Sequence, residues 1–88
     1  MKRNKLEIIQ DILKIIQENH NSIKPTPLLR KSNLSSARFN EYFHDLLRKE
    51  FVIEKELKGN KEIALTEKGF KYLEKYKTII GFIEEFEL

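Results

Sequence analysis

The sequence has no cysteine, and its 88 residues include only two prolines and three glycines. Without cysteine there can be no disulfide bonds and no thiolate metal sites, which fits a reducing compartment and predicts a cytoplasmic location. A glycine loop for phosphate and a matched set of nucleophile, base and acid are also missing. We therefore expect a protein that is not an enzyme and that needs no cofactor or metal.

Long apolar runs are missing as well. Residues 1–16 start with basic side chains, but charged and amide side chains interrupt the apolar residues that follow. This segment is therefore expected to be neither a signal peptide nor a membrane span. With 40% hydrophobic and 35% charged residues, the chain has the composition of one small globular domain. So small a domain buries little surface, and a second copy would add stability.

Both signs of charge are present, but they are distributed unevenly. The net charge is +3, which is only mildly basic and by itself a weak indication of nucleic-acid binding. Residues 1–31 carry seven Lys or Arg against three Asp or Glu, whereas residues 66–88 carry four against five. A basic first third and a slightly acidic end suggest different partners for the two parts.

Residues 26–52 have the pattern of two helices joined by a tight turn. Thr26 is expected to cap a helix that begins at Pro27, where a missing N–H costs nothing. Asn33 can adopt the left-handed conformation that ends a helix, and Ser35 can cap the next helix. Two helices joined in this way form a helix-turn-helix, whose second helix commonly reads a DNA major groove. The apolar residues of that helix recur on one face: Phe39, Tyr42, Phe43, Leu46 and Leu47.

A small β-hairpin is predicted after this motif. Glu50 stands where many such helices end in a left-handed glycine, so either glutamate costs about 1 kcal/mol there or the helix ends differently. Residues 51–57 and 62–65 alternate as strands around a turn at 58–61. We expect a short extended segment at Ile23 to pair with this hairpin. Its inner face is expected to carry Ile53, Leu57, Ile63 and Leu65.

The flanking segments predict two further helices. Asn4 and Glu7 have the spacing of a capping box, and a helix is expected from about Lys5 to Asn19. Thr66 is expected to cap a last helix that runs to about Phe86, with two apolar stripes. Residues 1–77 would form the domain, and residues 78–88 would extend past it and pair with a second copy. The expected dimer interface is Tyr72, Tyr76, Ile79, Ile80, Phe82, Ile83 and Phe86.

This order of elements resembles that of the small archaeal winged-helix transcriptional regulators and of related archaeal chromatin-type dimers. The strings that carry the resemblance are residues 26–29, 33–35, 42–47 and, above all, Leu65-Thr66-Glu67-Lys68-Gly69-Phe70. The resemblance implies a mostly α fold with a β-hairpin wing, in which the C-terminal helix pairs two subunits. It covers nearly the whole chain. Glu50 departs from the usual glycine, and the charge-balanced second helix of the motif departs from a strongly basic DNA reader.

The expected partner is double-stranded DNA, read in the major groove by the helix of residues 35–49. Asn40 can pair with adenine, Arg38 with guanine or a phosphate, and Glu41 can accept from cytosine. Hydroxyls and helix N-terminal amides can hold phosphates, and basic residues can contact the backbone beside the groove. The predicted contacts are Thr26, Arg30, Lys31, Ser35, Ser36, Arg38, Asn40, Glu41, His44, Arg48, Lys58, Asn60 and Lys61.

Several alternatives remain open at this point. Arg38 and Glu41 could simply pair with each other at i, i+3. The protein could be a local regulator, a non-specific chromatin-type binder, or a winged helix that docks another protein through its near-neutral face. The aromatic residues of the last helix could line a ligand pocket instead of packing, although no small-molecule effector is evident.

Overall fold

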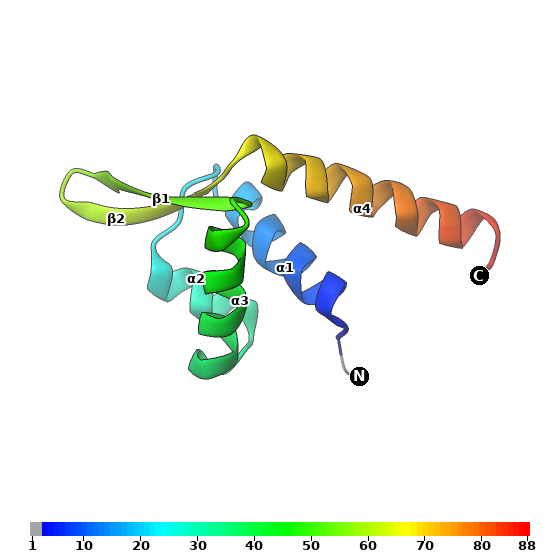
Figure 1. The fold of residues 1–88 in the computed structure, drawn as a ribbon, viewed down its shortest axis with the longest axis horizontal. Coiled ribbons are helices and arrows are strands. Elements are labelled where there is room, and N and C mark those ends of the chain that lie inside the picture. The colour runs from blue at the N-terminus through cyan, green and yellow to red at the C-terminus, as the bar shows by residue number, and fades with distance from the viewer. Residues whose placement is uncertain (1–2) are drawn as a thin grey trace.

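Four helices and one hairpin make up the computed structural model, which describes residues 3–88. The hairpin and the last helix leave the helical body in opposite directions, so the molecule measures 48 Å by 26 Å by 21 Å (Figure 1). The predicted order of elements is confirmed, and it is that of a winged helix. The elements are α1 (Lys5–Glu18), α2 (Pro25–Ser32), α3 (Ser36–Arg48), β1 (Val52–Leu57), β2 (Asn60–Leu65) and α4 (Glu67–Glu85).

The core lies where α1 crosses the other helices and the base of the hairpin. Asn4 caps α1 as predicted, with its side-chain oxygen accepting a hydrogen bond from the Glu7 N–H at 2.8 Å. Because α1 carries two adjacent apolar stripes, it is covered on more than one side. Its buried residues are Ile8, Ile9, Ile12, Leu13 and Ile16. They pack with Ile23, Leu28, Phe39, Phe43, Leu46, Val52, Ile63 and Leu65.

The start of α2 differs from the prediction. The helix begins at Pro25, and its N-cap is Lys24, which makes no side-chain capping bond. Thr26 is therefore inside the first turn, and the prediction that it caps the helix is wrong. With prolines at both 25 and 27, the first turn has fewer N–H groups to satisfy, so a capping hydroxyl is not needed there.

The turn between α2 and α3 follows the prediction. Asn33 adopts the left-handed conformation, with φ 60° and ψ 31°. Ser35 then caps α3, and its side-chain oxygen accepts a hydrogen bond from the Arg38 N–H at 3.2 Å. The end of α3 is also left-handed, since Glu50 has a φ of 62°. Its N–H and that of Phe51 bond back to the carbonyls of Leu47 and Leu46, which is a Schellman ending built without glycine.

The hairpin has a different inner face from the one predicted. Val52 lies opposite Leu65, and both are buried, whereas Ile53 and Leu57 are each 47% exposed. The apolar residues of β1 were assigned to the wrong face, although Ile63 and Leu65 are inside as predicted. The turn is also shorter than predicted. It consists of Lys58 and Gly59, both with positive φ as in a type I′ turn, so Asn60 already belongs to β2.

Ile23 connects the α1–α2 loop to the hairpin, as predicted. It exchanges two backbone hydrogen bonds with Ile63, at 2.8 and 3.1 Å. In the same loop, the Asn21 side-chain oxygen accepts a hydrogen bond from the Leu65 N–H at 2.7 Å. A two-stranded hairpin is unstable alone, and these contacts extend the sheet onto the helical body.

The last helix begins inside the fold and ends outside it. Thr66 caps it as predicted, accepting a hydrogen bond from the Gly69 N–H at 3.2 Å. Gly69 is the only buried residue of α4. A Cβ at this position would lie 2.4 Å from the Phe51 carbonyl oxygen, so only glycine allows the helix to start this close to β1. Beyond residue 80 every residue is exposed.

Candidate functional site

One whole side of α3 is uncovered. Phe39, Phe43 and Leu46 bury the opposite side in the core, where the two phenylalanine rings stack with centroids 5.5 Å apart. Since the buried side is apolar and well packed, the direction of the free side is fixed. All the predicted DNA-contacting residues within this helix are exposed, namely Ser36, Arg38, Asn40, Glu41, His44 and Arg48.

The residues predicted to contact the DNA backbone lie around this side. Thr26, Arg30 and Lys31 are exposed on α2, and Ser35 is exposed at the start of α3. The oxygen of Ser35 already serves as the helix cap. The other predicted contacts, Lys58, Asn60 and Lys61, are exposed at the tip of the hairpin, which projects beyond the helical body (Figure 1).

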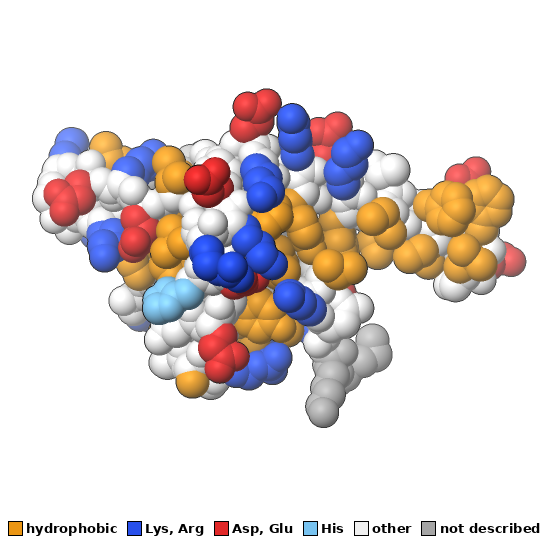
Figure 2. Space-filling view, in the orientation of Figure 1, with side chains coloured by type: hydrophobic (Ala, Val, Ile, Leu, Met, Phe, Trp, Pro, Cys, Tyr) orange, Lys and Arg blue, Asp and Glu red, His pale blue; other side chains and the backbone are white. Residues whose placement is uncertain are grey.

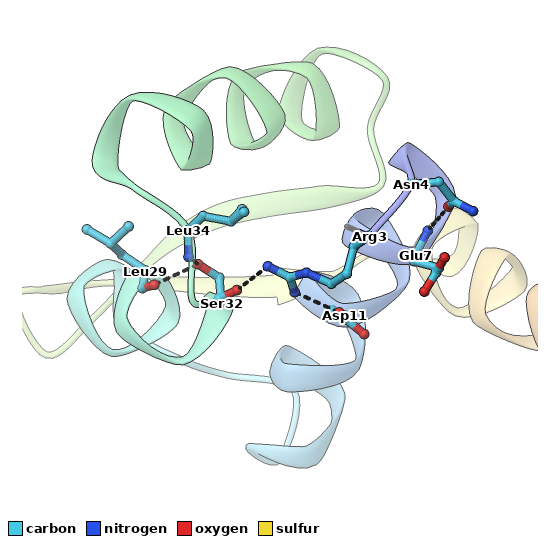
Figure 3. A network of polar contacts seen from close by, with 7 residues as sticks. All are labelled: Arg3, Asn4, Glu7, Asp11, Leu29, Ser32 and Leu34. Carbon is cyan, nitrogen blue, oxygen red and sulfur yellow. Dashed lines mark hydrogen bonds and ion pairs between the residues drawn. The ribbon is translucent and has the colours of Figure 1, made fainter. Parts of the chain in front are cut away.

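A polar network holds the α2–α3 turn against α1 (Figure 3). The Arg3 guanidinium donates to the Asp11 carboxylate at 2.7 Å and to the Ser32 carbonyl oxygen at 3.0 Å. Ser32 is 1% exposed, and its hydroxyl donates to the Leu29 carbonyl oxygen at 2.6 Å. The same oxygen accepts from the Leu34 N–H at 3.4 Å, so this network fixes both sides of the turn that sets the angle of α3.

One carboxylate on α3 pairs with two basic residues at the end of the helix. Asp45 accepts from Arg48 at 2.5 Å and forms an ion pair with Lys49 at 3.2 Å. The hydrogen bonds from Arg48 and Lys49 hold the pKa of Asp45 below its usual value, so the carboxylate stays charged at neutral pH. Sequence reasoning missed this arrangement, although the i, i+3 and i, i+4 spacings from Asp45 to the two cations indicate it.

The remaining predicted cations differ in whether they form an ion pair within the chain. Arg38 does not pair with Glu41; its guanidinium lies 6.0 Å from the centroid of the Tyr42 ring. At the hairpin, Lys61 forms an ion pair with Glu54 at 3.4 Å. Within residues 3–88, no ion pair involves Arg30, Lys31, Arg38 or Lys58.

A second uncovered surface lies on α4, and it is apolar. Figure 2 shows hydrophobic side chains gathered at the free end of this helix. Of the predicted interface residues, Ile79, Phe82, Ile83 and Phe86 are exposed, and the rings of Phe82 and Phe86 lie 4.8 Å apart. Tyr76 and Ile80 are half-buried, beside an open groove of 540 Å³ between α4 and α1.

Tyr72 is placed differently from the other predicted interface residues. Its hydroxyl donates to the Leu6 carbonyl oxygen at 2.9 Å, and its ring meets the edge of the Phe51 ring at 5.6 Å between centroids. Burial raises the pKa of Tyr72, and the neighbouring Tyr76 raises it further. Tyr72 therefore packs within its own chain. The side chain of Leu6 is 54% exposed next to it.

Two features that the described residues lack bear on other functions. Residues 3–88 contain no group of three His, Cys, Asp or Glu side chains that could hold a metal ion. None of the helices described for this chain combines the length and apolar character needed to cross a membrane.

A family model described as winged helix-turn-helix matches residues 2–84. None of the curated proteins matches the sequence. Among solved structures, similarity extends to Sso10a-2, a DNA-binding protein from Sulfolobus solfataricus. It has a TM-score of 0.76 and 20% identity, over 97% of this chain and 86% of that one.

Two further structures have the same fold. F93 from STIV, described as a winged-helix DNA-binding protein, has a TM-score of 0.74 and 21% identity, over 90% of this chain and 91% of that one. F-93 from SSV1 has a TM-score of 0.65 and 27% identity, over 89% and 91% of the two chains.

Proposed function

The chain belongs to the winged helix-turn-helix family, and from this premise we propose that it binds double-stranded DNA as a homodimer. In this proposal α3 enters the major groove and the hairpin tip contacts the backbone beside it. The observation that carries the proposal is the polar, uncovered side of α3, held in a fixed direction by its buried side. The descriptions of Sso10a-2 and F93, which share the fold, support DNA as the partner.

The exposed residues of α3 supply different kinds of contact. Asn40 can pair with adenine and Arg38 with guanine, while Glu41 can accept from cytosine. Ser36 and His44 flank these groups on the same side of the helix. Base edges would be read mainly by the first half of α3, because recognition helices present their N-terminal residues to the bases.

Most of the affinity for DNA is expected to come from basic residues on the elements that flank α3. Asp45 pairs with Arg48 and Lys49 and offsets one of their two positive charges, so the second half of this helix attracts phosphates less than its two cations alone would. Arg30 and Lys31 on α2 and Lys58 on the hairpin have no such partner in residues 3–88, and they can bind the DNA backbone on either side of the groove.

The distal part of α4, residues 78–88, is the proposed dimerisation segment. Ile79, Phe82 and Phe86 are each more than half exposed although they are large and apolar. A helix with such a stripe buries it most simply against its own copy. Two α3 helices about one turn of DNA apart, ~34 Å, would suit a palindromic site, and a local transcriptional regulator is the role we infer.

A salt titration of binding to a mixed-sequence duplex tests the proposal. The logarithm of the affinity should fall linearly with the logarithm of salt concentration, with a slope of about −0.9 for each phosphate contact. Equal affinity for unrelated duplexes would indicate a chromatin-type binder instead of a regulator. Absence of binding at low salt would exclude the proposal and leave a winged helix that docks another protein.

Two substitutions locate the binding surface. Arg38→Ala should weaken DNA binding by about 1–3 kcal/mol and relax specificity, whereas Lys58→Ala should reduce the salt slope by about one phosphate contact. Lys75→Ala is the matched control, because Lys75 is an exposed lysine on α4. Circular dichroism should show unchanged helix content in all three. If Arg38→Ala and Lys58→Ala bind as well as the control, the docking surface lies elsewhere.

A further inference from the structure

The outer edge of β1 has free backbone groups. In the described structure β1 pairs only with β2, and Ile63 of β2 exchanges both of its backbone hydrogen bonds with Ile23. The N–H and C=O of Ile63 therefore point away from β1. Glu54 lies opposite Ile63, so its own N–H and C=O point away from β2, and those of Glu56 do the same.

The two faces of this edge differ in character. One face carries Ile53 and Leu57, each 47% exposed, with the exposed Lys55 between them. The other face carries Glu54 and Glu56, which are also exposed. A strand laid along this edge would place its side chains alternately beside apolar residues and beside carboxylates, since successive side chains of a strand point to opposite faces.

A groove of 760 Å³ runs beside the base of the edge. Ile53 and Glu54 line one wall, and the beginning of α4 lines the other, with Glu50 at the end of α3 completing it. The two lysines that line this groove are engaged, as Lys68 donates to the Lys49 carbonyl oxygen at 2.8 Å and Lys71 lies 3.7 Å from Glu67.

The face of β1 that carries Glu54 and Glu56 keeps an excess of negative charge, because Lys55 points to the opposite face. Lys61 is held by Glu54 at 3.4 Å. Neither Glu50 nor Glu56 forms an ion pair within residues 3–88. Basic side chains on a neighbouring strand would therefore find two carboxylates on this face, Glu54 and Glu56, beside a single cation, Lys61.

We propose that the free edge of β1 docks an extended segment of another protein in which apolar and basic side chains alternate. The segment adds a strand to the sheet through the backbone groups of Glu54 and Glu56. Its apolar side chains cover Ile53 and Leu57, and its basic side chains lie beside the two glutamates. A second copy of β1 is a poor occupant, because antiparallel pairing would set glutamate beside glutamate.

The test uses a capped heptapeptide of alternating valine and lysine, titrated into the isotope-labelled full chain. The amide resonances of Glu54 and Glu56 should shift, and their hydrogen exchange should slow. The matched control peptide has glutamate in place of lysine and should cause neither effect. Equal binding of the two peptides, or resonance shifts confined to α3 or to the end of α4, would overturn the proposal.

Variants test the charge and the backbone pairing separately. Glu54→Gln with Glu56→Gln should weaken binding of the lysine peptide about fivefold, as two favourable cross-strand charge pairs are lost. Glu74→Gln with Glu85→Gln makes the same change in net charge at exposed positions of α4 and should leave binding unchanged.

Glu54→Pro tests the backbone directly, because it removes an outward N–H and no hydrogen bond to β2. It should abolish the slow exchange at Glu56 while the spectrum of the helices is kept. Unchanged peptide binding by both edge variants would overturn the proposal. So would protection of Glu54 and Glu56 that rises with protein concentration without peptide, since a second copy would then be the occupant.

Discussion

The two halves of α4 have different surroundings although they form one continuous helix. In the proximal half, Gly69 lies against the Phe51 carbonyl oxygen before β1, and Tyr72 bonds to the start of α1. In the distal half, Gly81 has no heavy atom within 4 Å of the position of a Cβ, and Phe82 and Phe86 are exposed. Helix formation is therefore supported by the chain's own core at one end only. At the other end the apolar side chains are exposed and contact no core of their own chain.

Removing the distal half should have the largest effect on assembly. If the proposed dimer forms through this segment, truncation after Lys77 is expected to leave a monomer by light scattering, because it deletes most of the uncovered apolar residues. The contacts of the proximal half are all retained, so the unfolding transition of the domain should persist. A dimer that survives this truncation would place the interface elsewhere, most simply on α1.

Substitution of a glycine should change the stability of the protein in opposite directions in the two halves of α4. Gly69→Ala places a Cβ 2.4 Å from the Phe51 carbonyl oxygen, so the chain must shift, and we expect a loss of about 1–3 kcal/mol in urea unfolding. Gly81→Ala meets nothing in the chain itself and should stabilise the helix by about 1 kcal/mol. A loss of dimerisation in Gly81→Ala would show that a second helix approaches closely at this glycine.

The smallest loss of stability is expected when the contact between Tyr72 and α1 is removed. Tyr72→Phe removes the hydrogen bond to the Leu6 carbonyl oxygen and should cost about 0.5–1.5 kcal/mol. Because burial raises the pKa of Tyr72, the unfolded chain releases this proton first, and stability should fall as pH rises above 10.0. The fall should be shallower in Tyr72→Phe. An identical pH dependence in the two proteins would mean that Tyr72 ionises equally in both states.

Local signals predicted the helices of this fold well. Asn4, Asn33, Ser35 and Thr66 are short polar residues at helix boundaries, and each has the conformation or capping bond expected of it. Their effect depends on neighbours within a few residues, so the sequence alone is sufficient to place them. The cap assigned to Thr26 failed because Pro25 starts the helix earlier.

The features that were missed depend on contacts between distant segments. Residues 51–53 are three consecutive apolar residues, and alternation alone cannot decide which of them faces the core. The two-residue turn at Lys58 and Gly59 and the pairing of Ile23 with Ile63 fix the register that decides it. The bridge from Arg3 to Ser32 joins residues 29 apart in sequence and has no local signature.

For the candidate DNA surface, the sequence predicted which side chains are exposed, but it did not predict which of them form ion pairs. Every residue of the predicted DNA surface is exposed, because the buried side of α3 determines the other side. The pairing of Asp45 with two cations depends on side-chain conformations, which the pattern of residue types does not specify.

The length of α4 has a consequence for how two copies would measure DNA. Its 19 residues make a rod of about 28 Å that is anchored to the body at one end only. In the proposed homodimer, a change of ten degrees in the angle between two such rods would move the two bodies by about 5 Å relative to each other. That displacement exceeds the ~3.4 Å between successive base pairs. The packing of the distal residues against each other would therefore set the angle between the two helices. That angle would in turn set the distance between the two DNA half-sites that the dimer can bind.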